Sequence, residues 1–371
     1  MATLGRLQHI ELAGFRSIKQ LSLDLAPLNI LIGANGAGKS NFVSFFTLMN
    51  RLAEKGLQLH VRAQLNGADR ALYFGCKVTE RLAVVLQFPF HRYRATLVPT
   101  NDDTLVFERE ALLFSGGVTG DVHEEKSQAL ATSGSGESGL PRAGTGSPAQ
   151  HLARCLQDWK VYHFHDTSDT ARIKGTYSIH ATERLMPRGE NLAAFLYHIR
   201  DTGNYQRIVR AIRRVAPFFQ DFVFLPEAND LIRLRWKHSG SDDYFDATML
   251  SDGTLRFICI ATLLQQPTMP SMILLDEPEL GLHPFAMQLL AAMMRSASET
   301  TQIIASTQSV TLANQFGWQD MVVVDRNSQG SQFRRLQEHE VACWMEQYKL
   351  GDVWEMNALG GTPNEAPGHQ R

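Results

Sequence analysis

Apolar and polar residues alternate along two stretches near the start of the chain, residues 7–15 and 18–25, and this alternation predicts a pair of strands. The following stretch PLNILI, residues 27–32, is apolar throughout, as expected of a strand buried on both faces. Beyond residue 40 the apolar residues repeat every three or four positions, which predicts a helix. Its apolar positions are Phe42, Phe45, Phe46, Met49 and Leu52.

The middle of the chain changes pattern twice. Residues 71–112 read as β-rich, because ALYFGCKV, RLAVVLQF, YRATLVP and TLVFEREALLF are separated by turn-forming clusters. Residues 115–150 are rich in Gly, Ser and Ala without an apolar period, which predicts a flexible loop. Residues 151–235 are mixed, with strand-like WKVYHFH and helix-like NLAAFLYHIR and YQRIVRAIRRVAPFF.

From residue 244 onward, helical and strand patterns alternate, as in parallel βαβ units. The expected elements are helix 254–266, strand 271–276, helix 284–296, strand 301–306, helix 309–315 and strand 320–325. We expect the two ends of the chain to share one sheet, with the middle inserted between them. The predicted parts are an N-terminal lobe at 1–112, an inserted subdomain at 113–235, a C-terminal lobe at 236–345 and a tail at 346–371.

Composition adds few constraints to this picture. The 371 residues are 44% apolar and 20% charged, which is ordinary for a globular protein. A net charge of -2 provides no overall basic bias toward nucleic acid, so such binding would need a local patch. The four cysteines match no zinc spacing. Without a signal peptide or a long apolar run, we expect a cytoplasmic protein that does not span a membrane.

The stretch GANGAGKS, Gly33–Ser40, fits the phosphate-loop pattern G-x-x-x-x-G-K-[ST] and lies between a predicted strand and a predicted helix. Glycines there let backbone N–H groups surround an anion, and the helix start adds partial positive charge. Lys39 would reach the phosphates of ATP, and Ser40 would bind Mg²⁺. The alternative is a glycine-rich turn with an exposed lysine. The expected nucleotide contacts are Asn35, Gly36, Ala37, Gly38, Lys39, Ser40 and Asn41.

A second stretch, SMILLDEPELGLHP, brings two acids to the end of an apolar strand. That edge of an α/β sheet is where ligands bind. Asp276 would hold Mg²⁺, and Glu277 would orient and polarise the attacking water. Solvated acids before a proline turn are the alternative interpretation.

A third stretch, LSDGT at 250–254, opens a buried helix. Ser251 or Asp252 is a suitable N-cap. Ser251, the backbone N–H of Gly253 and the helix dipole could also form an anion site. One copy of the chain does not need this second anion site for its own nucleotide, because the phosphate loop already provides an anion site.

These three stretches, in this order, resemble the ATP-binding cassette ATPases, and within them the SMC/RecF/OLD-type heads. More loosely, the whole chain is similar to the AAA_21 group of bacterial ATPases. The resemblance implies an α/β P-loop NTPase fold of the ABC-type head: a mixed β-sheet flanked by helices, with an inserted α+β subdomain. It implies a homodimer in which Ser251, Asp252, Gly253 and Thr254 touch the γ-phosphate held by the other copy.

The same resemblance implies roles for two further positions. Gln308 stands where many relatives have a γ-phosphate-sensing histidine, and an amide can donate a hydrogen bond but cannot relay a proton. Arg16, in GFRSIK, corresponds to a residue near the nucleotide or a partner. The family's glutamine loop has two candidates, Gln64 and Gln87, although each is better explained as a surface polar residue.

A histidine cluster and an arginine-rich helix each have a functional and a structural interpretation. His163, His165 and Asp166 have spacing that could bind a metal, but hydrogen bonding within the fold is favoured. A helix with four arginines could meet nucleic-acid phosphates, but a solvated helix face is favoured. These arginines are Arg207, Arg210, Arg213 and Arg214.

The leading hypothesis is an ATP-hydrolysing switch that dimerises around ATP and Mg²⁺. It would act on DNA or on a partner effector protein, in bacterial anti-phage defence or DNA repair. The alternatives are the nucleotide-binding subunit of a membrane transporter and a nucleotide-dependent scaffold with negligible turnover. The size of the inserted segment argues against the transporter.

Overall fold

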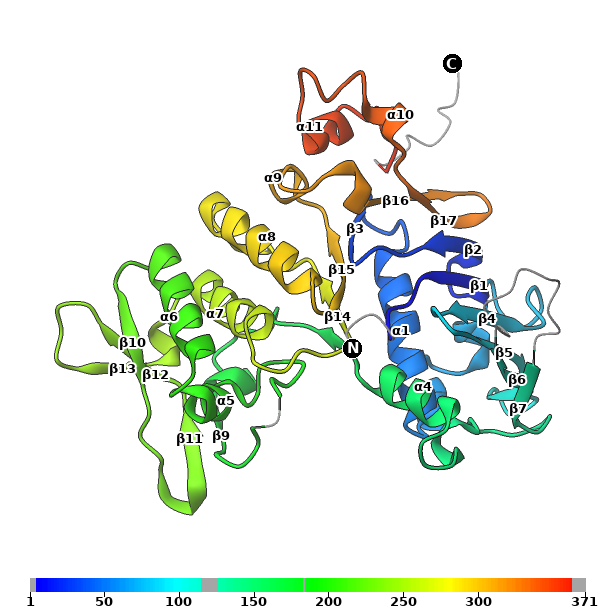
Figure 1. Cartoon of the computed structure of the whole chain (residues 1–371), viewed down its shortest axis with the longest axis horizontal. Coiled ribbons are helices and arrows are strands. Elements are labelled where there is room, and N and C mark those ends of the chain that lie inside the picture. Colours follow the sequence, from blue (N-terminus) through cyan, green and yellow to red (C-terminus); the bar gives the residue numbers. More distant parts are fainter. Residues whose placement is uncertain (1–4, 115–125, 183, 362–371) are drawn as a thin grey trace. The chain divides into compact units, whose positions relative to one another are not determined.

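The structure is a computed structural model that describes residues 5–114, 126–182 and 184–361 (Figure 1). Its internal contacts divide the chain into two compact units. Unit 1 comprises residues 1–160 and 317–371, and unit 2 comprises residues 161–316.

Unit 1 contains an antiparallel sheet in the strand order β2-β1-β4-β5-β6-β7. Inward residues of β4 and β5 alternate with partly exposed ones, as a sheet with one covered face requires. Pairing of β1 with β2 confirms the predicted strand pair. The strands are β1 (His9–Phe15), β2 (Ile18–Asp24), β4 (Leu82–Gln87), β5 (His91–Pro99), β6 (Leu105–Phe114) and β7 (Lys126–Ala131).

A second set of strands in unit 1 joins the two ends of the chain. The strand β3 (Leu28–Ile32) is buried along its whole length and pairs in parallel with β16 (Met321–Asn327). In turn, β16 pairs antiparallel with β17 (Gly330–Arg335). This arrangement confirms that strands from both ends share one sheet, and it positions the β16–β17 hairpin beside the loop that follows β3.

The helices of unit 1 surround these sheets. α1 has an apolar face because Phe42, Phe45 and Phe46 recur at helical spacing, and all three are fully buried. Phe46 packs against Trp159 with ring centroids 5.3 Å apart. The helices are α1 (Lys39–Ala53), α2 (Leu57–Ala63), α3 (Ala68–Ala71), α4 (Pro148–Gln157), α10 (Glu338–Val341) and α11 (Leu350–Glu355), and the 3₁₀ turns are Leu140–Arg142 and Trp318–Asp320. The short strand β8 (Trp159–Tyr162) crosses the boundary between the units.

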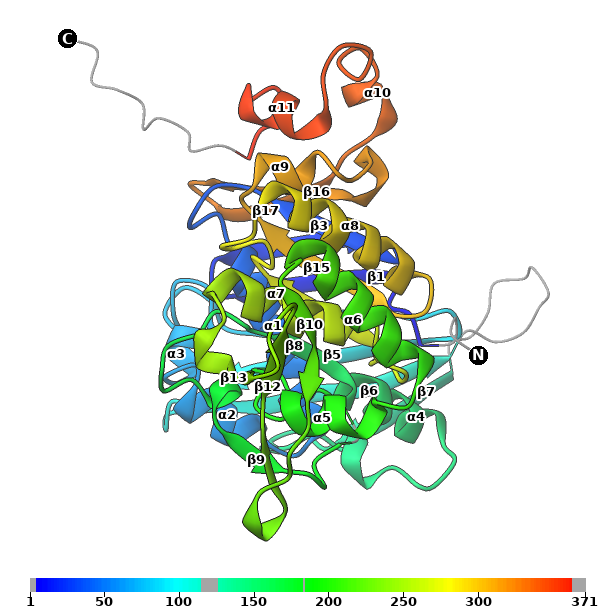
Figure 2. The same ribbon diagram turned by 90° about the vertical axis from the view of Figure 1, so that its left-hand side faces the viewer.

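Unit 2 is built around the parallel pair β14 (Met272–Asp276) and β15 (Gln302–Thr307). Three helices, α6 (Gly203–Val215), α7 (Asp252–Leu264) and α8 (Pro284–Ser298), contact one another and lie side by side in both ribbon views (Figures 1 and 2). The remaining helices are α5 (Leu192–Ile199) and α9 (Val310–Ala313), with 3₁₀ turns at Arg172–Lys174, Ala228–Asp230 and Ala247–Met249.

Two small antiparallel sheets complete unit 2. One has the order β10-β12-β13, and the other pairs β9 with β11. Their strands are β9 (Thr176–Ser178), β10 (Phe219–Val223), β11 (Leu231–Arg233), β12 (Arg235–His238) and β13 (Tyr244–Asp246).

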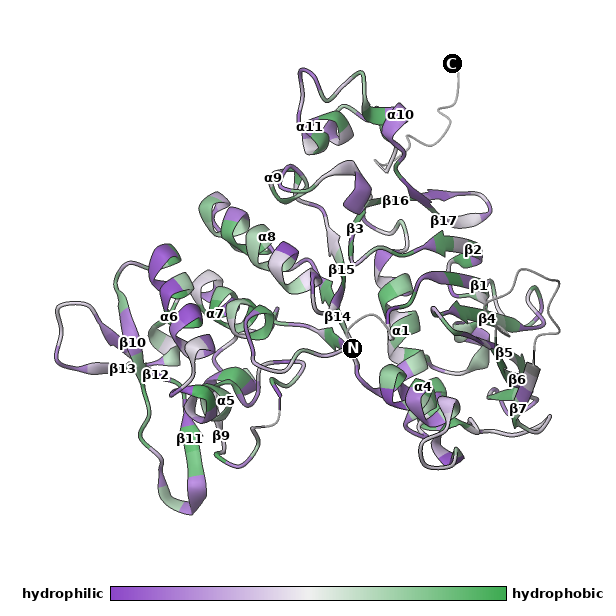
Figure 3. Ribbon diagram, viewed as in Figure 1, coloured by the Kyte–Doolittle hydropathy of each residue, from purple (hydrophilic) through white to green (hydrophobic). Residues whose placement is uncertain are grey.

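The arginines of α6 lie on a solvated face, as favoured from the sequence. The ribbon of α6 changes repeatedly between hydrophilic and hydrophobic colours (Figure 3). Its buried positions include Ile208, Val209 and Ile212. The exposed positions include Arg207, Arg210, Arg213 and Arg214.

The predicted flexible loop at 115–150 is wrong in its second half. Residues 126–131 form β7, which pairs with β6, and α4 begins at Pro148 behind the cap Ser147. The connection between them is anchored because the buried Glu110 carboxylate accepts hydrogen bonds from Ser138 and from the Gly139 N–H. Small residues permit such tight turns as readily as they permit disorder. Residues 115–125 lie outside the described part of the chain.

The predicted strand at 71–78 is also wrong. Residues 68–71 form the short helix α3, and a turn follows. Phe74 and Gly75 have φ values of 52° and 83°, and neither value is compatible with a strand. Leu72 and Tyr73 face the core here whereas Phe74 and Val78 are exposed, and periodicity alone does not distinguish such a turn from a strand.

The boundaries of the units differ from the predicted parts. The inserted subdomain was expected at 113–235, whereas unit 2 spans 161–316 and includes the predicted C-terminal strands and helices up to α9. Residues up to 160 stay with unit 1, because Asn50 of α1 donates hydrogen bonds to the carbonyls of Leu156 and Gln157 at the end of α4. Across the three described segments, no helix has both the length and the apolar character needed to cross a bilayer.

Candidate functional site

The loop Gly33–Ser40 leads from β3 into α1 and has a conformation that only glycine accommodates at two points. A Cβ on Gly38 (φ 119°) would lie 2.1 Å from the Ser331 hydroxyl oxygen, and one on Gly33 would lie 2.2 Å from the Val324 carbonyl oxygen. The N-cap of α1 is Gly38, which has no side chain to accept a hydrogen bond from the first turn of the helix. The loop therefore leaves the start of α1 available to an anion.

Lys39 is folded back over this loop. Its ammonium donates hydrogen bonds to the carbonyl oxygens of Gly33 and, at 3.0 Å, of Ala34, and only 5% of the residue is exposed. The buried stem fixes the ammonium at the centre of the loop. Asn35, Gly36 and Ser40 are exposed around it.

A chain of hydroxyl and amide groups holds the loop against the β16–β17 hairpin. Ser331 donates to the Ala37 carbonyl at 2.5 Å and lies 2.7 Å from the Ser17 hydroxyl, which accepts a hydrogen bond from Asn41 at 2.7 Å. Arg326 donates to the Gly36 carbonyl at 3.1 Å. Sequence reasoning missed Ser17, Arg326 and Ser331, because the loop and the hairpin lie about 290 positions apart in the chain.

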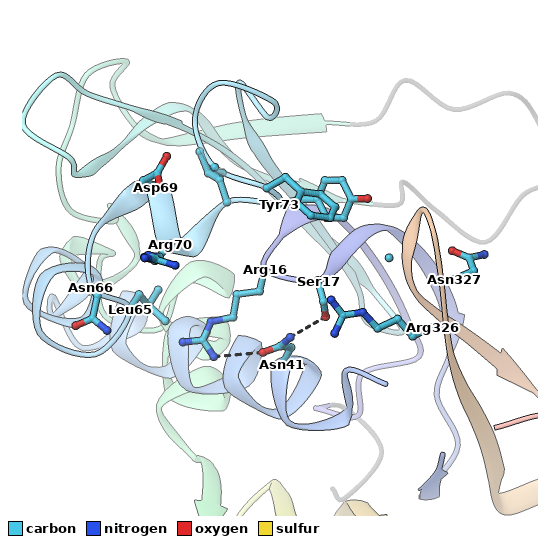
Figure 4. Close-up of a pocket in the computed structure, with 14 residues that line it drawn as sticks. Arg16, Ser17, Asn41, Leu65, Asn66, Asp69, Arg70, Tyr73, Arg326 and Asn327 are labelled. Atoms are coloured by element: carbon cyan, nitrogen blue, oxygen red, sulfur yellow. Dashed lines mark hydrogen bonds between the residues drawn. The ribbon is translucent and has the colours of Figure 1, made fainter. Parts of the chain in front are cut away.

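A cavity of about 900 Å³ opens beside Asn41, the residue that follows Ser40 (Figure 4). It is polar and basic: Arg16, Arg70 and Arg326 line it. Its residues come from the loop after β1, the α2–α3 region and the β16–β17 turn. The lining residues are Arg16, Ser17, Asn41, Leu65, Asn66, Asp69, Arg70, Leu72, Tyr73, Phe74, Gly75, Arg326, Asn327 and Gly330.

Of the non-glycine residues among them, Arg16, Asn66 and Phe74 have left-handed backbones, and asparagine adopts this conformation more readily than the other two. Arg16 and Phe74 have φ values of 50° and 52°, a left-handed conformation that costs side-chain-bearing residues about 1–3 kcal/mol. Burial lowers the pKa of the Arg16 guanidinium, which contacts the Asn41 amide oxygen at 3.5 Å. Phe74 is 67% exposed, although a large apolar side chain is normally buried. Strain and exposure of this kind are typical of ligand sites.

In unit 2, the end of β14 presents the two predicted acids. Asp276 accepts a hydrogen bond from the buried Ser306 hydroxyl on β15. Glu277 has a φ of 44°, and its carboxylate accepts a hydrogen bond from the Gln308 amide. The structure thus brings Glu277 and Gln308 together, from two neighbouring parallel strands. Ser306 was missed from the sequence, because a serine within an apolar strand carries no signal of its own.

A third carboxyl, Glu279, supports this strand end from below the surface. It accepts hydrogen bonds from the Thr307 hydroxyl and, at 3.2 Å, from the Gln308 N–H. Burial raises the pKa of the Glu279 carboxyl. Through these hydrogen bonds Glu279, which lies in the SMILLDEPELGLHP stretch, fixes the turn that carries Gln308.

The start of α7 is closed by its own cap. The Ser251 hydroxyl accepts a hydrogen bond from the Thr254 N–H at 3.3 Å and lies 2.8 Å from the Thr254 hydroxyl. A Cβ on Gly253 would lie 2.4 Å from the Gly281 carbonyl oxygen, so the helix start packs tightly on the loop after β14. Ser251 and Asp252 are exposed.

The predicted residues thus form two groups. Unit 1 holds Arg16 and Asn35 to Asn41, whereas unit 2 holds Ser251 to Thr254, Asp276, Glu277 and Gln308. Of the glutamine-loop candidates, Gln64 is an exposed residue at the end of α2, and Gln87 has its side chain bonded to Arg92 and the Phe88 carbonyl.

His165, from the histidine cluster, makes a hydrogen bond within the fold. Within the described segments, no group of three or more His, Cys, Asp or Glu side chains is arranged to hold a metal ion. His165 instead contacts the Asp276 carbonyl oxygen at 2.7 Å. This outcome agrees with the favoured interpretation, hydrogen bonding within the fold.

Residues 28–314 match the AAA_21 family, which is described as "AAA domain, putative AbiEii toxin, Type IV TA system". No curated protein matches the sequence. The structure of an Smc head bound to the C-winged helix domain of ScpA is similar, with a TM-score of 0.56 and 13% identity over 90% of this chain and 99% of that chain.

A second Smc head has an extended coiled coil and is bound to the C-terminal domain of ScpA, derived from Pyrococcus furiosus. It gives a TM-score of 0.54 at 13% identity, over 92% of this chain and 98% of that chain. At such identities the likeness establishes the fold, and the family match independently covers most of the chain.

Proposed function

The chain belongs to the AAA_21 family of P-loop ATPase domains and has the fold of an SMC-type head, and from this premise we propose that it hydrolyses ATP with Glu277 as the base. The observation that carries this proposal is the pair formed by Glu277 and Gln308 at the strained end of β14.

The phosphate loop of unit 1 binds the triphosphate. The uncapped start of α1 supplies N–H donors and partial positive charge, and Lys39 supplies an ammonium that can exchange the loop carbonyls for phosphate oxygens. The neighbouring basic cavity takes the rest of the nucleotide, with Arg16 and Asn41 on one side and the exposed Phe74 ring available for base stacking.

The residues present also suit Mg²⁺. Each unit by itself offers one suitable donor: the exposed Ser40 hydroxyl in unit 1, and in unit 2 the Asp276 carboxylate oxygen that Ser306 does not engage. Such hard oxygen donors are the ligands Mg²⁺ prefers. When bound, the ion would neutralise phosphate charge.

Glu277 performs the proton chemistry. Its carboxylate orients a water molecule for attack on the γ-phosphorus and accepts a proton from it. The Gln308 amide holds the carboxylate in place and, being unable to titrate, only positions it. An adjacent buried Glu279 keeps the Gln308 backbone fixed.

The active assembly is a head-to-tail homodimer. The exposed residues Ser251 and Asp252 and the N–H of Gly253 in one copy would meet the γ-phosphate bound by the other copy. Binding of ATP closes the dimer and hydrolysis opens it, which makes the protein a switch acting on DNA or on a partner effector.

The comparisons support two parts of this proposal, the role in defence and the coupling to an effector. The family description names a toxin of a type IV toxin–antitoxin system, which supports a role in bacterial anti-phage defence. The Smc heads that share the fold were solved with a bound partner protein domain, which supports coupling to an effector. DNA repair is the competing use.

The Glu277→Gln variant tests the proposal. We expect ATP turnover to fall about 10²- to 10⁴-fold, the usual contribution of a positioned base, while ATP binding persists. With ATP and Mg²⁺, light scattering should show a dimer that accumulates in this variant and turns over in the wild type.

A matched variant, Glu346→Gln, removes an exposed carboxylate from unit 1 and should behave as wild type. Equal, near-zero turnover by the wild type and by Glu277→Gln would instead establish a nucleotide-dependent scaffold. A Glu277→Gln protein that stays monomeric with ATP would contradict the dimer.

A further inference from the structure

His165 makes an unusual contact with the backbone of β14. Its Nε2 atom lies 2.7 Å from the carbonyl oxygen of Asp276, across 111 positions of sequence. A carbonyl oxygen only accepts hydrogen bonds, so Nε2 must carry the hydrogen. The ring is thereby committed to one tautomer and one orientation.

The Asp276 carbonyl belongs to the peptide group that joins Asp276 to Glu277. At its other side, the Glu277 N–H donates to the Ser306 carbonyl at 3.0 Å. A peptide group is planar, so bonds at its oxygen and at its nitrogen together fix the orientation of the whole plane. The next backbone angle, the φ of Glu277, is 44°, and a non-glycine residue holds this angle only when its surroundings impose it.

His165 is itself held firmly. Arg256 of α7 donates to the His165 carbonyl at 2.9 Å, to the Thr167 hydroxyl at 3.4 Å and to the Leu280 carbonyl at 3.1 Å. His165, Arg256 and Glu277 border the same small cavity. The segment after β8 is therefore bonded both to α7 and to the end of β14.

We infer that His165 is a positioning residue, which sets the direction of the Glu277 carboxylate by holding the Asp276–Glu277 peptide in its strained orientation. The inference rests on the proposed role of Glu277 as the base. Without the His165 donor the peptide plane is free to relax, and Glu277 moves away from the productive position. Misplacement of a reacting group by about 1 Å can slow a reaction about 100-fold.

The first test compares His165→Phe, which keeps a ring but removes the donor, with His165→Gln, whose amide can donate in place of Nε2. We expect a kcat for ATP hydrolysis at least tenfold lower in His165→Phe, with an unchanged Kd for ATP. In His165→Gln we expect a partial return of kcat. The exposed His198 of α5, in the same unit, provides the control His198→Phe, which should retain wild-type kcat.

A wild-type kcat in His165→Phe would overturn the inference. So would equal losses in His198→Phe and His165→Phe, since it is the His165 ring that contacts the Asp276 carbonyl. A simple folding defect would lower nucleotide binding and the melting temperature along with kcat, and His165→Gln would then show no selective recovery.

A second measurement uses the wild-type protein and does not depend on turnover. Nitrogen NMR of histidine-labelled protein, assigned with His165→Gln, should show His165 as the Nε2–H tautomer, and an Nδ1–H tautomer would overturn the inference. If the wild type shows no Glu277-dependent turnover, the proposed function fails, and the tautomer reports separately whether the contact exists.

Discussion

Two helices in this protein begin at loops proposed to hold a triphosphate, and their starts are built in opposite ways. α1 begins at Gly38 with no side-chain cap and no acid in its first turn. α7 begins at Ser251, whose hydroxyl caps the Thr254 N–H, and it carries Asp252 in its first turn. Both helices are long, with 15 and 13 residues, so both have a substantial dipole at the N-terminus.

The difference follows from competition for the same donors. A capping side chain and a bound anion both accept hydrogen bonds from the first N–H groups of a helix. α1 leaves these groups to a ligand, and Lys39 adds a positive charge. In α7 the Thr254 N–H is bonded to the Ser251 hydroxyl, and the Asp252 carboxylate already lies at the positive end of the helix. The two starts should therefore differ in strength, with α1 binding nucleotide unaided and α7 joining only a phosphate that another copy already holds.

Lys39→Ala tests the expected difference between the starts of α1 and α7 with the largest effect. Losing one charged hydrogen bond of about 1.5–3 kcal/mol should weaken ATP binding roughly 10- to 150-fold, and dimerisation and turnover should be lost with it. Thermal unfolding would show this, because ATP should raise the melting temperature of Lys39→Ala by less than that of the wild type and of the surface variant Lys19→Ala. An undiminished rise in Lys39→Ala would show that α1 does not depend on this ammonium.

Ser251→Arg separates the two helix starts. The bulky cation should block docking of a second copy and should remove a cap that contributes about 1 kcal/mol to stability, while nucleotide binding to one copy continues. We expect normal ATP affinity but no ATP-induced dimer by light scattering, and greatly reduced turnover.

Its control is Ser239→Arg, at another exposed serine of unit 2. Loss of ATP affinity in Ser251→Arg would mean that α7 contributes to binding within one copy. Persistence of the dimer would mean that α7 does not face the partner's nucleotide.

Asp252→Asn should have the smallest effect of these variants, and it should increase the affinity of the ATP-bound dimer. A carboxylate near a phosphate repels it by about 1 kcal/mol at 4 Å in water, so its removal should tighten the ATP-bound dimer up to roughly fivefold. The gain should shrink as salt is added, because exposed charges are screened.

Sedimentation of Asp252→Asn in the Glu277→Gln background measures the dimer affinity, with Asp242→Asn as the charge-matched control in the same unit. A weaker dimer, or a gain that is independent of salt, would show that the carboxylate makes a favourable contact instead.

Much of the fold was predictable from local patterns. The strand pair, the phosphate loop with α1, and the alternation from α7 to β16 all follow from periodicity and from motifs with fixed spacing. The errors at 71–78 and 115–150 occurred where composition misled. Apolar residues in a turn resemble a strand, and glycine-rich segments resemble loops even when a buried carboxylate such as Glu110 anchors them.

The site was predictable in its chemical groups but not in its supports. Lys39, Glu277 and Gln308 stand in recognisable motifs, whereas the hydrogen bond between Gln308 and Glu277 appears only in the structure. Ser331 and His165 act on the same elements from distant segments, through hydrogen bonds that no spacing rule anticipates.

The sequence alone determined which residues are the candidates for chemistry, because loop conformation at glycines, helix dipoles and strand ends are properties of short segments. Tertiary structure decided how those residues are held: the phosphate loop is bonded to Ser331 of β17, and the peptide before Glu277 is bonded to His165. The reason is physical. A hydrogen bond between segments a hundred or more residues apart depends on where the whole core places them, and that information is not contained in either segment.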